Sequence, residues 1–249
     1  MLTSNSPEFL FSISEVENFR PDTSSRLRHY FNFIRENHMD FRGDIVEFGV
    51  FRGASLVATA LLLKELGSNK KVYGFDSFSG FPNYSSNDDL EAFSSENGFD
   101  KETLDRVAEY QNVMSKLWDK EIDGSSASSS GDFSNTSSEL VQRKLNFFQL
   151  DNVKIIEGNF AESVREKSLN DMDLMCANID CDLYDGYQDS MEFIWHKLER
   201  GGFVHLDEYY SLKFPGAKIA VDEFCRKYGI SVTEQISRSG EFPRVSLIK

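Results

Sequence analysis

The sequence predicts an α/β protein built on a mainly parallel sheet with helices on both faces. Short apolar segments of strand type alternate with segments of helical type from residue 44 onward. Such alternation is typical of parallel sheets, because a helix carries the chain back to the start of the next strand. Hydrophobic residues make up 40% of the 249 residues, which is enough to bury a sizeable core. We expect one domain spanning residues 1–249.

The pattern of apolar residues predicts each element in turn. Five apolar runs predict strands over residues 44–50, 71–76, 153–157, 173–180 and 202–207. Three amphipathic or apolar segments predict helices over residues 53–66, 185–198 and 217–228. The last residues, SVTEQISRSGEFPRVSLIK, contain two alternating segments around residues 239–240, which indicates a hairpin.

Two regions lie outside this alternation. Residues 1–40 contain apolar side chains at helical spacing, which predict an N-terminal helix over residues 24–38. Residues 83–134 form a long insert after the second strand, with a helical stretch near residues 101–118 and a Ser-rich tract. An insert of this length is either a surface excursion or a functional lid.

Charge and cysteine usage exclude several classes of protein. The chain has 27 Lys plus Arg against 41 Asp plus Glu, a formal net charge of −14. Such a surface repels phosphate backbones and anionic lipids, so we expect no nucleic-acid or membrane partner. The three cysteines show no CxxC spacing, and neither a signal peptide nor an apolar run of about 20 residues is found. We expect a cytoplasmic protein.

Ligands of open parallel sheets bind at the carboxyl ends of the strands. The first strand is followed there by GVFRGAS, in which glycines let a ligand approach the backbone and the next helix offers its N-terminus. Asp76, at the end of the second strand, can accept hydrogen bonds from both hydroxyls of a ribose. The alternatives are an ordinary turn and a turn-capping aspartate.

Four carboxylates follow the fourth and fifth strands: Asp180, Asp182, Asp207 and Glu208. If these strands are neighbours, the carboxylates repel one another unless a cation lies among them or some are protonated. Oxygen ligands favour Mg²⁺, Mn²⁺ or Ca²⁺. The alternative is that they cap helices and point apart. We interpret His205 as structural, and Phe78, Phe81, Phe133 and Phe160 are candidate ligand walls.

Six segments in order complete the pattern: DIVEFGVFRGAS, YGFDSFSGFP, GDFSNTSSELVQRKL, VKIIEGNFAESV, IDCDLYDGYQDSMEFIWHKLERGGFVHLDEYY and GAKIAVDEF. Together they resemble the macrocin O-methyltransferase family of class I S-adenosylmethionine-dependent methyltransferases. The resemblance covers residues 44–225 and depends on the ordered set, above all FDSFSGFP and DCDLY.

This resemblance implies a Rossmann-like fold with a seven-stranded sheet. It also implies Mg²⁺-dependent methyl transfer from S-adenosylmethionine to a hydroxyl of a sugar or glycosylated natural product. The implied metal ligands are Asp180, Asp207 and Glu208, and the implied general base is Asp182. The implied cofactor residues are Glu47, Gly49, Ser55, Asp76 and Ser77, with the adenine near Gly158, Asn159 and Phe160. The oligomeric state stays open, with a homodimer among the alternatives.

The sequence departs from the family at two site positions. Glu208 stands where the family usually has a second Asp, and Cys181 stands in place of a smaller residue. Two other functions stay open at this point. One is a catechol-type O-methyltransferase for small phenols, which uses the same fold and metal chemistry. The other is a protein that binds S-adenosylmethionine without transferring a methyl group.

Overall fold

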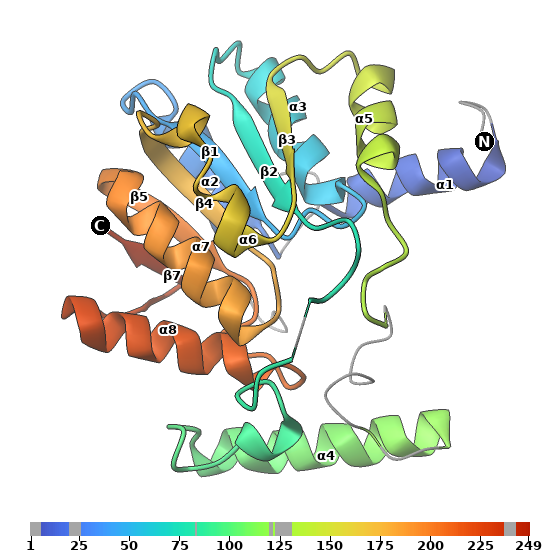
Figure 1. Ribbon diagram of the computed structural model, residues 1–249, viewed down its shortest axis with the longest axis vertical. Coiled ribbons are helices and arrows are strands. Elements are labelled where there is room, and N and C mark those ends of the chain that lie inside the picture. The colour runs from blue at the N-terminus through green and yellow to red at the C-terminus, as the bar shows by residue number, and fades with distance from the viewer. Residues whose placement is uncertain (1–5, 20–25, 83, 120–121, 123–130, 237–242) are drawn as a thin grey trace.

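A computed structural model of the chain describes residues 6–19, 26–82, 84–119, 122, 131–236 and 243–249. Its centre is a seven-stranded sheet in the order β3-β2-β1-β4-β5-β7-β6 (Figure 1). The first five strands run parallel, whereas β7 pairs antiparallel with both β5 and β6. The predicted fold class and the C-terminal strand pair are therefore confirmed, although the turn at residues 239–240 lies outside the described residues.

The strands fall close to their predicted positions. Their bounds are β1 (Asp44–Phe48), β2 (Val72–Asp76), β3 (Val153–Glu157), β4 (Leu174–Ile179), β5 (Leu198–Leu206), β6 (Thr233–Glu234) and β7 (Val245–Ile248). The largest difference is β5, which begins four residues before the predicted start at 202. Gly201 and Gly202 lie inside this strand, so the glycine pair does not mark its beginning as the pattern suggested.

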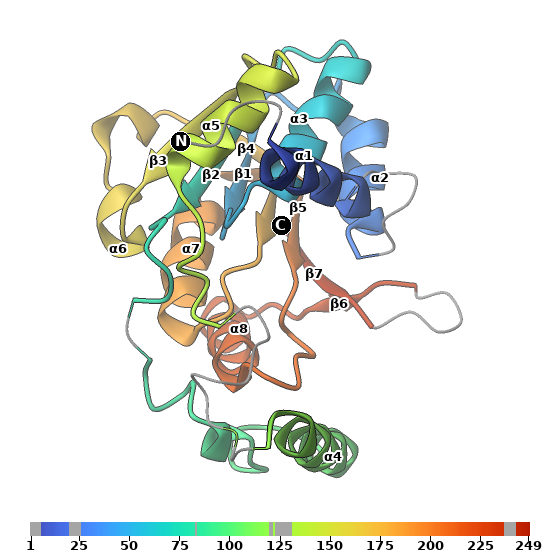
Figure 2. The ribbon, with the colours of Figure 1, turned by 90° about the vertical axis from the view of Figure 1, so that its right-hand side faces the viewer.

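Helices cover both faces of the sheet because alternate strand residues point to opposite sides. Val46 and Phe48 of β1 belong to the core with α6 (Phe160–Ser163), α7 (Tyr184–Lys197) and α8 (Pro215–Tyr228). Ile45 belongs to the core on the other face, which contains α2 (Arg28–Asn37), α3 (Ala54–Glu65) and α5 (Ser138–Phe147). Figure 2 shows these two groups of helices on either side of the strands.

Several short helices were not anticipated by periodicity. They are α1 (Pro7–Ser14), η1 (Glu15–Phe19), α5, α6, η2 (Leu90–Ala92) and η4 (Lys167–Leu169). Local capping accounts for two of them. Ser6 accepts a hydrogen bond from the Phe9 amide at the start of α1, and Ser137 accepts one from Leu140 at the start of α5. The predicted helix over 24–38 is α2, but residues 24–25 lie outside the described residues.

The insert contains α4 (Lys101–Trp118), as predicted, and lies at one end of the molecule beyond α8 (Figures 1 and 2). Ala92 and Phe99 of the insert pack against Ile219 of α8. Asp88 accepts a hydrogen bond from the amide of Tyr184 at 2.8 Å, which caps the start of α7 from a distant part of the chain. The first part of the insert is thus fixed to the sheet domain.

Among the described residues, no helix is long and apolar enough to cross a membrane.

Candidate functional site

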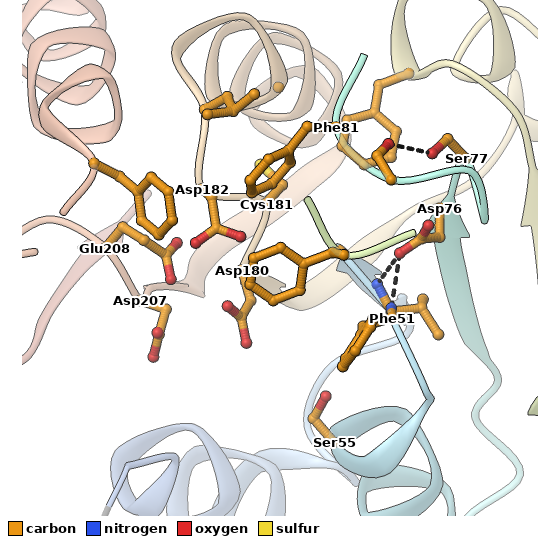
Figure 3. Close-up of a pocket in the computed structure, with 18 of the residues that line it drawn as sticks. Phe51, Ser55, Asp76, Ser77, Phe81, Asp180, Cys181, Asp182, Asp207 and Glu208 are labelled. Atoms are coloured by element: carbon orange, nitrogen blue, oxygen red, sulfur yellow. Dashed lines mark hydrogen bonds between the residues drawn. The ribbon is translucent and has the colours of Figure 1, made fainter. Parts of the chain in front are cut away.

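A pocket of about 910 Å³ opens at the carboxyl ends of the central strands. This volume is in the range of pockets that bury small-molecule ligands. All but one of the predicted site residues line it: Gly49, Ser55, Asp76, Ser77, Gly158, Asn159, Phe160, Asp180, Asp182, Asp207 and Glu208. Figure 3 shows Asp76 and Ser77 at one end of the pocket. Four other acidic side chains gather at the opposite end: Asp180, Asp182, Asp207 and Glu208. The pocket therefore has an acidic end and a glycine-rich end.

The loop between β1 and α3 forms the floor of the glycine-rich end. Gly49 has a φ of +87°, and a Cβ there would overlap the carbonyl oxygen of Asp180. Gly53, the cap of α3, has a φ of +77°. Both positions need glycine, because a side chain would be strained by the backbone and blocked by its neighbours. The N-terminus of α3 lies at the pocket, because Ala54 and Ser55 line it, and the start of a helix suits an anionic group.

Glu47 is the exception, because it does not line the pocket. Its side chain is fully buried beneath the loop, where it accepts a hydrogen bond from Ser55 Oγ at 2.7 Å. Asn178 Nδ2 lies 3.4 Å from the other carboxylate oxygen. Burial raises the pKa of Glu47 to about 8, although the Ser55 hydrogen bond acts in the opposite direction. Its geometry is that of a residue that positions Ser55 rather than one that contacts a ligand.

Asp76 holds the loop in place from the end of β2. Its Oδ2 accepts hydrogen bonds from the amides of Val50 at 2.8 Å and Phe51 at 2.7 Å, as Figure 3 shows. Its Oδ1 accepts one from the Phe78 amide at 2.7 Å. Burial raises its pKa against these hydrogen bonds. A carboxylate can accept about four hydrogen bonds, so Asp76 keeps capacity for a ligand.

The remaining residues of this end come from turns beside β2 and β3. Ser77 Oγ donates to the carbonyl of Gly80 at 2.9 Å. Asn159 caps α6 by accepting from the Ala161 amide at 2.9 Å. Phe160 packs edge-on against Phe48, with ring centroids 5.1 Å apart. The predicted adenine region is therefore a turn with one aromatic wall.

Pairing of β4 with β5 creates the acidic end. Ile179 lies opposite Leu206 in this parallel pair, so the residues that follow them, Asp180 and Asp207, emerge side by side. Asp180, Asp207 and Glu208 each offer a carboxylate oxygen within 4.8 Å of the others. The neighbouring strands that the sequence analysis required are thus observed. Hard oxygen ligands in this number fit Mg²⁺ or a similar cation.

Glu208 is held in this cluster by Tyr187 of α7. The Tyr187 hydroxyl donates to Glu208 Oε2 at 2.7 Å and accepts from the Glu208 amide at 3.1 Å. Burial, together with the neighbouring carboxylates Asp207 and Asp180, raises the pKa of Glu208 well above its usual range. The longer side chain is therefore fixed by a partner that the sequence pattern did not single out.

Asp182 reaches the pocket from the turn that follows β4. The strand ends at Ile179, and Asp182 adopts a φ of +65°. The turn, not strand alternation, directs its carboxylate toward the cluster (Figure 3). Asp182 is buried, and burial with Asp180 and Asp207 raises its pKa well above the usual range.

Two arginines complete the acidic end, and the sequence analysis missed both. Arg26 donates from Nε to Asp207 Oδ1 at 2.7 Å and from Nη2 to Asp180 Oδ1 at 3.0 Å. Arg244 donates to Asp207 Oδ1 at 3.0 Å. Burial alone would raise the pKa of Asp207, but Arg26, His205 and Arg244 hold it well below its usual range. No local motif marks Arg26, which lies 154 residues before Asp180.

Aromatic side chains wall the space between the two ends. Three of the four predicted wall residues, Phe81, Phe133 and Phe160, line the pocket, whereas Phe78 does not. Tyr110 of α4 also lines it, so the insert contributes to the site. Phe81 and Phe133 contact each other with ring centroids 5.0 Å apart. The pocket therefore combines polar ends with an apolar middle.

The model of the macrocin-O-methyltransferase (TylF) family matches residues 23–115 and 115–242. The chain belongs to this family. The match confirms the family predicted from the sequence and extends it over most of the chain.

Three curated relatives are similar in sequence. The 8-demethyl-8-(2,3-dimethoxy-alpha-L-rhamnosyl)-tetracenomycin-C 4'-O-methyltransferase of Streptomyces olivaceus is 26% identical over 211 residues, 81% of this chain and 66% of the relative. Demethyldecarbamoylnovobiocin O-methyltransferase of Streptomyces niveus is 24% identical over 76% of this chain and 60% of the relative. Mycinamicin III 3''-O-methyltransferase of Micromonospora griseorubida is 25% identical over 82% and 69%. The chain thus spans less than two thirds of the first two relatives.

Two solved structures share the fold. The O-methyltransferase NovP has a TM-score of 0.61 and 22% identity, covering 88% of this chain and 79% of NovP. The calicheamicin methyltransferase CalS11 has a TM-score of 0.62 and 19% identity, covering 99% of this chain and 94% of CalS11. These similarities confirm the Rossmann-like class I methyltransferase fold.

Proposed function

We propose that the protein is an S-adenosylmethionine- and Mg²⁺-dependent O-methyltransferase that acts on a hydroxyl of a sugar or glycosylated natural product. The observation that carries the proposal is the pocket itself. Four carboxylates from the ends of β4 and β5 share one cavity with the glycine loop and Asp76. A cofactor at the glycine-rich end would leave the acidic end for an acceptor and a cation.

The sugar acceptor is supported by the relatives. The tetracenomycin and mycinamicin relatives are named as 4'- and 3''-O-methyltransferases, and the first name includes a rhamnosyl group. The aromatic walls fit such an acceptor, since the apolar faces of a sugar ring pack against aromatic side chains. We further propose that the described part of the insert around α4 covers this acceptor end, because Tyr110 of α4 lines the pocket.

The residues that line the pocket have separate proposed roles in binding the cofactor and the cation. Gly49, Ser55, Asp76 and Ser77 would bind and orient the cofactor, with Gly158, Asn159 and Phe160 around its adenine. Asp180, Asp207 and Glu208 would hold the cation. When bound, S-adenosylmethionine supplies an electrophilic methyl group and the cation supplies Lewis acidity toward the acceptor hydroxyl.

Asp182 is the proposed general base. Its carboxylate lies beside Asp180 but outside the group of three whose oxygens converge within 4.8 Å. Burial and the neighbouring carboxylates raise its pKa in the cation-free protein, and a cation held by those carboxylates would favour the ionised form that accepts a proton. Asp182 would accept the proton of the acceptor hydroxyl as the methyl group transfers, and no covalent intermediate with the enzyme is needed.

The proposal is tested with the purified protein, S-adenosylmethionine carrying a labelled methyl group, and two acceptor panels. One panel holds glycosides with vicinal diols and the other holds catechols, and products are identified by mass spectrometry. We expect label on glycosides, loss of transfer in excess chelator, and recovery when Mg²⁺ is restored. The D182N variant is the matched control for enzyme-dependent transfer.

Three results would contradict parts of the proposal separately. Transfer to catechols alone would replace the sugar acceptor with a small phenol. Full transfer in excess chelator would remove the cation from the mechanism. Binding of S-adenosylmethionine without transfer to any acceptor would indicate a non-catalytic binding protein.

A further inference from the structure

The guanidinium of Arg26 lies among the same three carboxylates that would hold the cation. Its Nη2 is 3.0 Å from Asp180 Oδ1, forms a hydrogen bond with Asp207 Oδ2, and lies 3.9 Å from Glu208 Oε1. Its Nε donates to Asp207 Oδ1 at 2.7 Å. One nitrogen of this side chain therefore faces every proposed ligand.

A divalent cation bound by these oxygens could not share the site with this side chain. Mg²⁺ and Ca²⁺ bind carboxylate oxygens at about 2.0–2.6 Å. An ion at that distance from all three carboxylates would overlap Nη2 or lie within a few ångströms of it. Two positive charges this close repel strongly in a partly buried site. Arg26 and the cation are consequently alternative occupants.

Arg26 is placed so that its side chain can leave without unfolding the helix behind it. The side chain is 38% exposed. The next residue, Leu27, is 1% exposed and packs in the core at the start of α2. The backbone is therefore anchored, while the long side chain stays partly exposed to solvent.

Arg244 can be compared with Arg26, because both arginines contact the same carboxylate. It also pairs with Asp207, at 3.0 Å from Oδ1, and it donates to the Asp207 carbonyl at 3.1 Å. These contacts hold Asp207 from the strand side. Arg244 thus contributes the same charge to the same carboxylate, but it also binds the backbone of Asp207.

We propose that Arg26 is an internal cation that occupies the metal site of the cation-free protein and is displaced when a divalent cation binds. This inference rests on the proposed function, because it concerns the same three carboxylates. In the cation-free protein Arg26 balances the carboxylates. It also lowers the apparent affinity for the cation, because the cation binds only during the fraction of time in which Arg26 has left the site. If Arg26 occupies the site for about 90–99% of the time, the apparent affinity for the cation is reduced about 10- to 100-fold.

The experiment measures Mn²⁺ binding by the full-length protein, without cofactor or acceptor, from the electron paramagnetic resonance signal of free Mn²⁺. We expect R26Q to bind Mn²⁺ about 10- to 100-fold more tightly than the wild type. R26A should show the same gain, which excludes a new ligand contributed by the Gln side chain. R244Q should raise the affinity less than R26Q does, because Arg244 pairs with Asp207 whereas Arg26 Nη2 lies among all three carboxylates. Circular dichroism confirms that each variant is folded.

Three other outcomes would contradict the inference, and each gives a different pattern of Mn²⁺ affinities. An equal gain in R26Q and R244Q would mean that net charge alone governs affinity. Wild-type and R26Q proteins that bind Mn²⁺ equally would show that Arg26 does not occupy the site, while the proposed metal site would stand. Absence of Mn²⁺ binding in every variant would overturn both this inference and the metal part of the proposed function.

Discussion

Replacement of Glu47 by Gln should stabilise the protein at alkaline pH. The pKa of this carboxyl is raised from 4.5 to about 8 by burial, so it is protonated near neutral pH in the folded protein and ionised in the unfolded one. A raised pKa contributes stability that is present below the unfolded value of 4.5 and is lost as pH rises through 8. Each pKa unit corresponds to about 1.36 kcal/mol, so the full loss is about 5 kcal/mol.

The E47Q variant would avoid this loss because its amide side chain is neutral at every pH. The amide carbonyl can still accept the Ser55 hydrogen bond that Glu47 accepts at 2.7 Å. The amide nitrogen can donate to Asn178 Oδ1, a buried atom that has no hydrogen-bond partner within the described part of the chain. Rotation of the Asn178 amide would bring that oxygen toward residue 47. The substitution therefore removes a charge without removing the local hydrogen bonds.

The assay is thermal or urea unfolding of the wild type and E47Q in chelator from about pH 5 to pH 9. We expect the two free energies of unfolding to be similar at the acidic end and to diverge above it, with E47Q more stable by up to about 5 kcal/mol at the alkaline end. E109Q, a change at an exposed position of α4, is the control. Parallel stability curves for the wild type and E47Q would refute the raised pKa and the buried, neutral state of Glu47.

Three further substitutions test the site and the insert. D182N should lower kcat about 10²- to 10⁴-fold with cofactor affinity unchanged, as expected for a positioned general base, and recovery at high Mg²⁺ alone would make Asp182 a metal ligand instead. D76A should weaken S-adenosylmethionine binding about 10- to 100-fold in titration calorimetry, since hydrogen bonds to a charged group are worth about 1.5–3 kcal/mol, and unchanged affinity would remove Asp76 from the cofactor site. D88A leaves the amides of Tyr184 and Ser85 without their acceptor. It should increase hydrogen exchange over residues 84–99 while β1 is unchanged, and equal exchange in both proteins would show that Asp88 does not anchor the insert.

The strand-and-helix order, and the polar residues that follow the strands, could be predicted from the sequence because they depend on local patterns. The segments that form β1 and β4 are mainly apolar runs in the sequence. Such runs are typical of strands of a parallel sheet, which are covered on both faces, and both strands are largely buried. Parallel strands bring their carboxyl ends to one edge of the sheet, so carboxylates such as Asp180 and Asp207 were expected to meet there. The structure brings them together through the pairing of β4 with β5.

The tertiary structure decided what surrounds those residues. Glu47 lies close to Gly49 in the chain, yet the loop passes over it and removes it from the pocket. Asp182 owes its direction to a left-handed turn that strand alternation does not predict. Arg26 and Arg244 reach Asp207 across 181 and 37 residues of chain. Periodicity and motif spacing report on neighbours in the chain, whereas these contacts exist only because the folded sheet brings distant segments to the same edge.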